Sequence, residues 1–325
     1  MKPWAKAAVS ATLLALLFVL LPWSDVRAAA SSLPPRTWLA VLVGFLVGHG
    51  LGVFKWRALL AACRAVLTVR EAARCYSAGL FANLCLPSIV GGDVLRAVMA
   101  GRASGRVEGA FLAGIADRAL DVATLAILIT AGAIAARGAL PGWSGEVLTA
   151  ATVLGMLGVL GAAPFVLRRP LRRWPRRVRR PLGRALVSLR HLGRRPGAAA
   201  FALTLSLTMQ GGFVLLNLGI GSALGIHLPA GVWFVAWPLA KIAGLMPISL
   251  GGLAVRDATF GALLLPLGVP MATGVVAALV WQTVLIAGGL AGGLVWWLLS
   301  RQPGGAGVRG LLAAARGGGG GGTGG

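Results

Sequence analysis

Long uninterrupted apolar runs dominate the hydropathy pattern of this chain. Several reach the roughly 20 residues that an α-helix needs to cross about 30 Å of hydrocarbon. The runs are continuous rather than alternating, so they favour membrane-spanning helices over the strands of a barrel. Full spans are predicted at about 7–23, 38–54, 107–136, 146–167, 198–221 and 271–299. The pattern therefore predicts an all-α, polytopic integral membrane protein.

Two stretches between these spans interrupt the apolar pattern with helix-breaking residues. Residues 86–97 read LPSIVGGDVLRA and residues 246–257 read MPISLGGLAVRD, and both contain Pro, three residues, Gly-Gly, three residues and Arg. Proline cannot continue the helical hydrogen-bond ladder, and paired glycines permit a turn that leaves N–H groups uncovered. We expect a helical hairpin at each stretch. The first would have a helix over about 72–86, a break at Pro87 and a second short helix after Gly92.

The lysines and arginines beside the spans predict the threading of the chain, because cytoplasmic loops are enriched in them. Positive residues flank 75–95 on both sides, so this segment is expected to begin and end in the cytoplasm. Segment 231–268 is expected to begin and end outside. Each is therefore predicted as a re-entrant hairpin, the two entering from opposite faces, with both termini cytoplasmic. The positive residues used are Lys2, Lys6, Lys55, Arg57, Arg64, Arg70, Arg74, Arg96, Arg102, Arg106, Arg301, Arg309 and Arg316.

The order span, span, broken hairpin, span occurs twice, in repeats of about 7–137 and 146–299. Each repeat crosses an odd number of times, so the copies are predicted to be inverted, an architecture of transporters with a midplane substrate site. Coincidental similarity in a glycine-rich chain is the alternative. The prediction is a single transmembrane domain over 1–300, with a cytoplasmic loop at 168–197 and a disordered glycine-rich tail at 301–325. A signal peptide ending at Arg-Ala-Ala-Ala is the alternative for the first span.

The composition supports a membrane protein and bounds its partners. Hydrophobic residues make up 57% of the chain and charged residues 12%, against about 25% charged in soluble domains. The formal net charge is +23, and Arg168–Arg195 contributes 12 arginines without an acid. We interpret this loop as a topology signal that can also contact anionic lipid heads; a nucleic-acid partner is disfavoured.

The cysteines and histidines show no metal-binding or redox spacing, and the glycine pairs lack the context of a nucleotide-binding loop. We therefore expect no metal, no disulfide and no cofactor. The residues concerned are Cys63, Cys75, Cys85, His49, His191 and His227.

The first group of candidate site residues surrounds the first break: Asn83, Gly91, Gly92, Asp93 and Arg96. A structural reading has Asp93 capping the short helix and Arg96 reaching the cytoplasmic interface. A functional reading is an anion site, in which the N–H groups at the helix N-terminus and the Arg96 guanidinium bind a phosphate. Both readings can hold together.

The second group is Asp117, Arg118 and Asp121. Asp117 and Asp121 are four residues apart and share a helix face, and Arg118 is placed to pair with Asp121. If the helix begins near Val107, Asp117 lies about 15 Å along it. Charges at such depth oppose insertion by about 2.5–3.5 kcal/mol each, so we expect them to be paired and to face the interior. Three interpretations are open. The residues pair with one another in a purely structural cluster, or the helix begins later and they lie near the membrane interface. In the functional interpretation they line a path for a head group or relay protons.

The third group flanks the second break: Lys241, Gly251, Gly252, Arg256 and Asp257. Its acid follows the arginine instead of preceding it. Lys241 is either a mid-membrane cation or an interfacial lysine. The second repeat lacks the acidic and basic triad of the first, so the two halves are chemically unequal and a directional task is plausible.

The stretches YSAGLFANLCLPSIVGGDVLRA, ADRALD and LMPISLGGLAVRD together resemble the transmembrane domain of the lysylphosphatidylglycerol synthases. This family of bacterial and archaeal membrane proteins includes free-standing members, and the resemblance covers nearly all of the chain except its tail. The second motif usually ends in Gly-x-Gly-x-Arg-Glu in the family. Here it reads Gly252, Ala254, Arg256 and Asp257, which weakens that part of the resemblance.

The resemblance implies a flippase-like role in the bacterial inner (plasma) membrane, since the domain moves aminoacylated phosphatidylglycerol between leaflets in full-length enzymes. Those enzymes carry an additional aminoacyltransferase domain, so this chain is not expected to charge lipids itself. The leading hypothesis is translocation of the polar head of an anionic phospholipid or polyprenyl-linked substrate. The alternatives are a membrane-embedded transferase or hydrolase that uses Asp93 or Asp117 as base, and a non-catalytic partner of a lipid-modifying enzyme. A homo-oligomer is compatible with each.

Overall fold

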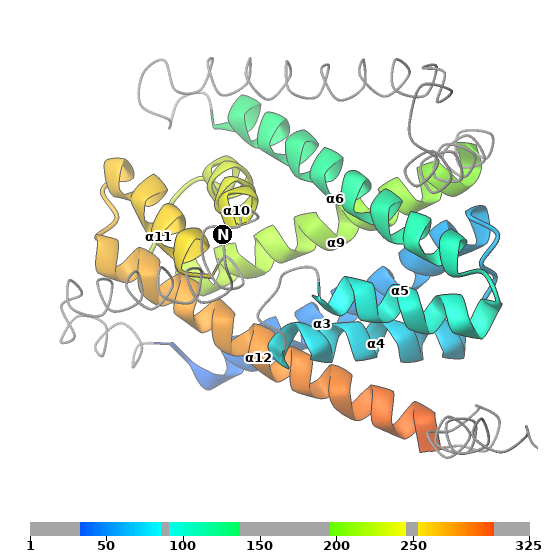
Figure 1. Ribbon diagram of the computed structural model, residues 1–325. Coiled ribbons are helices and arrows are strands. Elements are labelled where there is room, and N and C mark those ends of the chain that lie inside the picture. Colours follow the sequence, from blue (N-terminus) through cyan, green and yellow to red (C-terminus); the bar gives the residue numbers. More distant parts are fainter. Residues whose placement is uncertain (1–32, 86–90, 137–195, 245–252, 302–325) are drawn as a thin grey trace, which may run out of the picture.

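The computed structural model describes residues 33–85, 91–136, 196–244 and 253–301, which are helical almost throughout (Figure 1). The helices are α3 (Pro35–Ala62), α4 (Val69–Cys85), α5 (Gly91–Ser104), α6 (Val107–Ala135), α9 (Pro196–Ala223), α10 (Ala230–Gly244), α11 (Leu253–Leu264) and α12 (Met271–Arg301), with a short 3₁₀ turn at Leu265–Leu267. The described residues contain no strand. The chain is an all-α protein, as its apolar pattern predicts.

Four of the helices, α3, α6, α9 and α12, are long and apolar enough to cross a membrane. They contain 28 to 31 residues, or about 42–46 Å at 1.5 Å per residue, which exceeds the thickness of the hydrocarbon layer. They coincide with the spans predicted at 38–54, 107–136, 198–221 and 271–299. The chain is therefore a polytopic membrane protein.

Several predictions fall outside the described residues. These are the spans at 7–23 and 146–167, the loop over 168–195, the tail from 302 onward, and Pro87, Pro247, Gly251 and Gly252.

Helices α4 and α5 form the first predicted hairpin, and they run antiparallel and in contact. The Gly92 N–H donates to Asn83 Oδ1 at 3.1 Å, which joins the two arms where they meet. Because α5 begins at Gly91, Asp93 lies inside its first turn. The expectation that Asp93 caps a helix starting after Gly92 is therefore wrong. Helices α10 and α11 likewise pack together at the second break.

The helices pack in a reciprocal pattern. α3 packs against α9, α6 packs against α10, and α12 packs against α4, so each repeat's last long helix contacts the other repeat's hairpin. In Figure 1, α3 and α12 run from left to right, whereas α6 and α9 run from right to left. These opposed directions support the predicted inversion of the second repeat.

Two glycines at equivalent positions allow this reciprocal packing. A Cβ added at Gly132 of α6 would lie 2.8 Å from the Gly231 carbonyl oxygen of α10. A Cβ at Gly292 of α12 would lie 3.2 Å from the Ser77 carbonyl oxygen of α4. The offset, 292 − 132 = 160 residues, equals that between the two break motifs. Small residues that let helix backbones approach are typical of membrane helix interfaces.

Several tryptophan and phenylalanine side chains pack in the interior, and the exposed large side chains of the outer faces are mostly aliphatic. Trp233, Trp237 and Phe260 pack in one buried cluster, while Trp56 belongs to a second one nearer the α4–α5 hairpin. Large apolar side chains are exposed along the outer faces of the long helices, as expected where lipid is the solvent. Those on α3 and α12 include Leu39, Val43, Val47, Ile286, Leu290, Leu294, Trp297 and Leu298.

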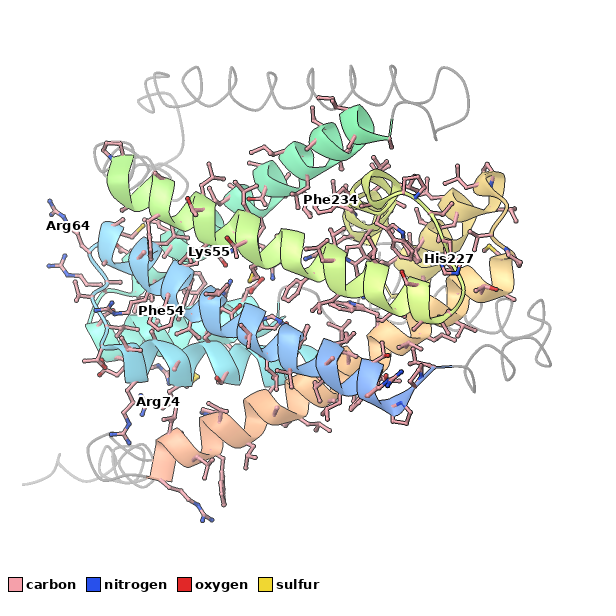
Figure 2. All side chains as sticks on the ribbon, turned by 180° about the vertical axis from the view of Figure 1, so that it is seen from behind. Phe54, Lys55, Arg64, Arg74, His227 and Phe234 are labelled. Carbon is pink, nitrogen blue, oxygen red and sulfur yellow. The ribbon has the colours of Figure 1, made fainter. Side chains whose placement is uncertain are left out.

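Positive side chains gather at one end of the bundle. Figure 2 places Arg64, just after α3, and Arg74 at the same end, with His227 at the opposite end. The C-terminal end of α12, which finishes at Arg301, also lies at the arginine end (Figure 1). This charge asymmetry is the one that the threading argument requires.

Candidate functional site

Lys55 of α3 lies at the centre of a charged cluster between the helices. Its side chain is 2% exposed, and Nζ lies 2.9 Å from Asp117 Oδ1 and 2.6 Å from Asp121 Oδ1. The two aspartates do share one face of α6, as the spacing predicts. A single ammonium thus neutralises part of the repulsion between two carboxylates, and it fastens α3 to α6.

Arg96 of α5 adds a second cation to the same cluster. Its guanidinium donates to Asp117 Oδ2 at 2.7 Å and lies 3.0 Å from Asp93 Oδ1. It is 5% exposed and stacks over the rings of Trp56 and Tyr76, with Cζ 5.0 and 5.4 Å from the ring centroids. The expectation that Arg96 reaches out to the interface is therefore wrong, because its charge is held inside by two carboxylates and two aromatic faces.

Arg118 forms the outer edge of the cluster. Its Nε donates to Asp93 Oδ2 at 2.6 Å, and its side chain is 44% exposed. The predicted pairing of Arg118 with Asp121 is wrong, because Asp121 turns inward to Lys55 while Arg118 turns outward to α5. Tertiary contacts across the bundle thus replace the local contact along one helix.

The second repeat completes the cluster with polar groups and one cation. Ser206 of α9 donates to Asp121 Oδ1 at 2.9 Å. Lys241 of α10 donates to Gln210 Oε1 at 2.7 Å and lies over the Phe213 ring, 5.8 Å from its centroid. Lys241 therefore lies between the helices, and its depth in the membrane stays a prediction.

These groups line one cavity of about 110 Å³ that both repeats enclose. The charges on its walls are four cations and three carboxylates, so 4 − 3 leaves one net positive charge. Neutral polar groups and apolar side chains complete the wall. The lining residues are His49, Lys55, Tyr76, Gly79, Leu80, Asn83, Asp93, Arg96, Asp117, Arg118, Asp121, Met209, Gln210, Phe213 and Lys241.

The structure brings most of the predicted site residues together but separates the third group. Asn83, Asp93, Arg96, Asp117, Arg118, Asp121 and Lys241 line the cavity, whereas Arg256 and Asp257 do not. Arg256 instead donates to Asp257 Oδ1 at 2.7 Å and to Gln282 Oε1 at 3.1 Å, in a buried group under Trp237. Gly91 and Gly92 are the first two residues of α5, and the Gly92 N–H donates to Asn83 Oδ1.

Sequence reasoning missed several cavity residues. Lys55 was interpreted only as a topology signal, because it directly follows the span predicted at 38–54, whereas α3 continues to Ala62. Gln210 is a polar position inside the span predicted at 198–221, which is a weak signal, as is Ser206, which does not line the cavity but donates to Asp121. His49 and Tyr76, whose Nδ1 and hydroxyl lie 3.0 Å apart, gave none, because only the fold brings them together.

Within the described ranges, no group of three or more His, Cys, Asp or Glu side chains could hold a metal ion. The absence of a metal or cofactor stays a prediction for the chain.

Fold and site define a class: a polytopic helical membrane protein with a buried, charged cavity between two sets of helices. Residues 4–293 match the family model described as the lysylphosphatidylglycerol synthase TM region. The chain belongs to this family, as its motifs indicate. Comparisons with curated proteins and with solved structures found no match.

Proposed function

We propose that this protein is a flippase-like carrier that moves the polar head of an anionic phospholipid or lipid-linked substrate between membrane leaflets. The observation that carries the proposal is the charged cavity enclosed by α3, α4, α5, α6, α9 and α10. Seven charged side chains line this cavity among apolar helices, and charged residues at such positions oppose insertion unless they are paired. Ionisable residues inside membrane segments commonly mark the path of a polar substrate. Only the head group needs such a path, because the acyl or prenyl tails can stay in lipid.

The position of Arg118 supports a substrate that resides in the membrane. Phe111, Ile115, Arg118 and Val122 fall on one stripe of α6, and the three apolar members are 37–59% exposed. Next to Asp93 on α5, Val94 and Leu95 are exposed too. The Asp93–Arg118 pair therefore joins the cavity to a lipid-facing surface, where a head group can enter from the side.

The arrangement of the repeats supports alternating access. The cavity lies between the first repeat, which carries all three aspartates, and the second, which contributes Gln210 and Lys241. Inverted repeats that rock around a fixed site expose it first to one side of the membrane and then to the other. We propose that the arginine-rich end faces the cytoplasm of a bacterial cell, in the inner membrane.

The enzyme alternative has less support, since a general base needs a free carboxylate. Asp117 is bound by both Lys55 and Arg96, and Asp93 is bound by Arg96 and Arg118. A carrier needs no such free base.

The test uses the full chain reconstituted into vesicles with phosphatidylglycerol labelled on its head or acyl chain. We expect the protein to speed the movement of label between leaflets, and Arg96→Ala to reduce that movement. Arg301→Gln, which removes an exposed cation at the far end of α12, serves as control and should behave as wild type. Movement no faster than in protein-free vesicles would remove the proposal for that lipid. Mass spectrometry of the recovered lipid separates transport from chemical turnover, which Asp117→Asn should abolish if the protein is an enzyme.

A further inference from the structure

The charges of the cavity divide unequally between the two repeats. In the first repeat, three cations (Lys55, Arg96, Arg118) face three carboxylates (Asp93, Asp117, Asp121), so 3 − 3 leaves no net charge. In the second repeat, Lys241 is the charged residue on the cavity wall. Among the described lining residues, the net positive charge of the cavity therefore comes from Lys241, which belongs to the second repeat, whereas the aspartates belong to the first.

Lys241 has a neutral partner where the other three cations have carboxylates. Its Nζ donates to the Gln210 amide oxygen, and Gln210 is 3% exposed. Among the described residues, no carboxylate lies within 4.0 Å of Lys241 Nζ. An ammonium in a low-dielectric interior is stable only with compensation, which an amide dipole and an aromatic face supply in part. A bound anion supplies the rest.

In the described part of the chain, a second donor without a partner belongs to Arg96, which also lines the cavity. Arg96 is 5% exposed, and its buried Nε–H has no hydrogen-bond acceptor among the described residues. Its Nη2 is paired with both Asp117 and Asp93. Within the described ranges, Arg96 thus has one unpaired N–H, and Lys241 has a charge with no carboxylate in direct contact, and the two residues belong to different repeats around one cavity.

We propose that this cavity is a binding site for one net negative charge, the phosphodiester of a membrane lipid, with Lys241 as the residue that selects charge and Arg96 as a hydrogen-bond donor. The inference rests on the proposed function and specifies its substrate class. A zwitterionic head group brings its own cation, which meets Lys241 as a like charge. A monoanionic head group makes the cavity neutral, and its volume of about 110 Å³ accommodates several water-sized groups.

The test measures lipid retention by native mass spectrometry of the purified full chain, titrated with equal amounts of phosphatidylglycerol and phosphatidylcholine of the same acyl composition. We expect wild type to retain phosphatidylglycerol preferentially. The soluble head group, glycerophosphoglycerol, is added as a competitor in a parallel arm. It should displace the lipid weakly, because it lacks the tails that remain in the bilayer; displacement at equal concentration would mean a free phosphate ester as ligand and would overturn the lipid assignment.

Two substitutions of different kinds bring the cavity to zero net charge. Lys241→Gln removes the cation, and Gln210→Glu keeps it but places a carboxylate beside it. Each should lower the preference for phosphatidylglycerol by roughly tenfold or more, as expected when one member of a buried charge contact is lost or already satisfied. Lys241→Arg should retain the preference. The matched control is Arg301→Gln, an equal loss of charge at an exposed position, which should also retain it.

The result that overturns the inference is an unchanged preference in both Lys241→Gln and Gln210→Glu, or an equal loss in Arg301→Gln, which would assign the binding to surface charge. Gln210→Glu guards against misfolding, because it adds an ion pair instead of removing one. The vesicle assay is independent of this result. Selective retention without transbilayer movement would refute the carrier function and keep the anion site. Transbilayer movement that does not depend on Lys241 would keep the carrier function and refute the anion site.

Discussion

Lys55 Nζ donates a hydrogen bond of 2.6 Å to Asp121 Oδ1, across 66 positions of the sequence. The same ammonium lies 2.9 Å from Asp117 Oδ1, so one cation of α3 serves two carboxylates of α6. With Arg96 on the far side of Asp117, the cluster forms a chain of alternating charge through the bundle. This arrangement makes the charges of the first repeat mutually dependent.

Removal of Lys55 should therefore destabilise the protein strongly. Lys55→Met leaves Asp117 and Asp121 close together without the ammonium, and breaking a buried ion pair from one side costs about 3–5 kcal/mol. The midpoint of thermal unfolding in detergent should fall markedly. Adding Asp121→Asn to Lys55→Met should recover part of the loss, because Asp121 is the carboxylate left without a paired cation, whereas Asp117 keeps Arg96. Equal midpoints of thermal unfolding for Lys55→Met and wild type would show that the ion pairs of Lys55 do not stabilise the packing of α3 against α6.

Arg118 should matter for transport more than for stability. Its side chain is 44% exposed, and Asp93 keeps Arg96 as a partner when Arg118 is replaced. Exposed ion pairs contribute about 0–1 kcal/mol, so Arg118→Gln should leave the unfolding midpoint nearly unchanged. The initial rate of lipid movement in the vesicle assay should fall several-fold if lipid heads enter beside α6. A rate equal to that of wild type would place the entrance elsewhere.

Gly92 should tolerate no side chain. A Cβ there would collide with the Gly79 carbonyl oxygen and the Asn83 amide, which belong to the opposite arm of the first hairpin. Gly92→Ala should destabilise by about 1–3 kcal/mol, the usual cost of overpacking. Gly114→Ala is the matched control in α6, since nothing lies within 4 Å of its added Cβ. It should leave the midpoint of thermal unfolding unchanged or raise it, and a similar loss in both variants would contradict the steric explanation.

Glu71 should give a small acid-dependent contribution at the start of α4. The Thr68 backbone N–H and hydroxyl both donate to its carboxylate, and these bonds hold the pKa of Glu71 below its usual value. A lowered pKa stabilises the fold above the unfolded-state pKa of about 4.3, and the contribution is lost as pH falls through the folded-state value. Glu71→Gln should therefore lower the free energy of unfolding at about pH 7. The loss should be less than about 1 kcal/mol, because solvent screens the site. The difference from wild type should shrink at about pH 3, and a difference that grows on acidification would be contrary to this sign.

The elements of the fold could be predicted because lipid imposes a simple rule on sequence. A chain that crosses hydrocarbon must bond its backbone internally, so apolar length alone located α6, α9 and α12 within a few residues. It located the start of α3 as well, but α3 continues to Ala62, eight residues beyond the predicted end. The break motifs located the hairpin helices for a similar reason, since proline and paired glycines interrupt that bonding. The predictions that failed, for Arg118 and the Asp93 cap, assumed contacts between near neighbours in sequence.

The sequence by itself determined the class of the protein, the helices, the charge asymmetry and the family, because these depend on local composition and on motifs. Only the tertiary structure decided which charges meet. In the folded protein, Asp117 pairs with Lys55 and Arg96, and Arg118 pairs with Asp93. Lys241 donates to a neutral amide, and Arg256 and Asp257 pair with each other away from the cavity. The physical reason is that Asp117 and its two cations, Arg118 and Asp93, and Lys241 and Gln210 pair between different helices. Which helices adjoin depends on close backbone packing at positions such as Gly132 and Gly292, not on the spacing of charges along the chain.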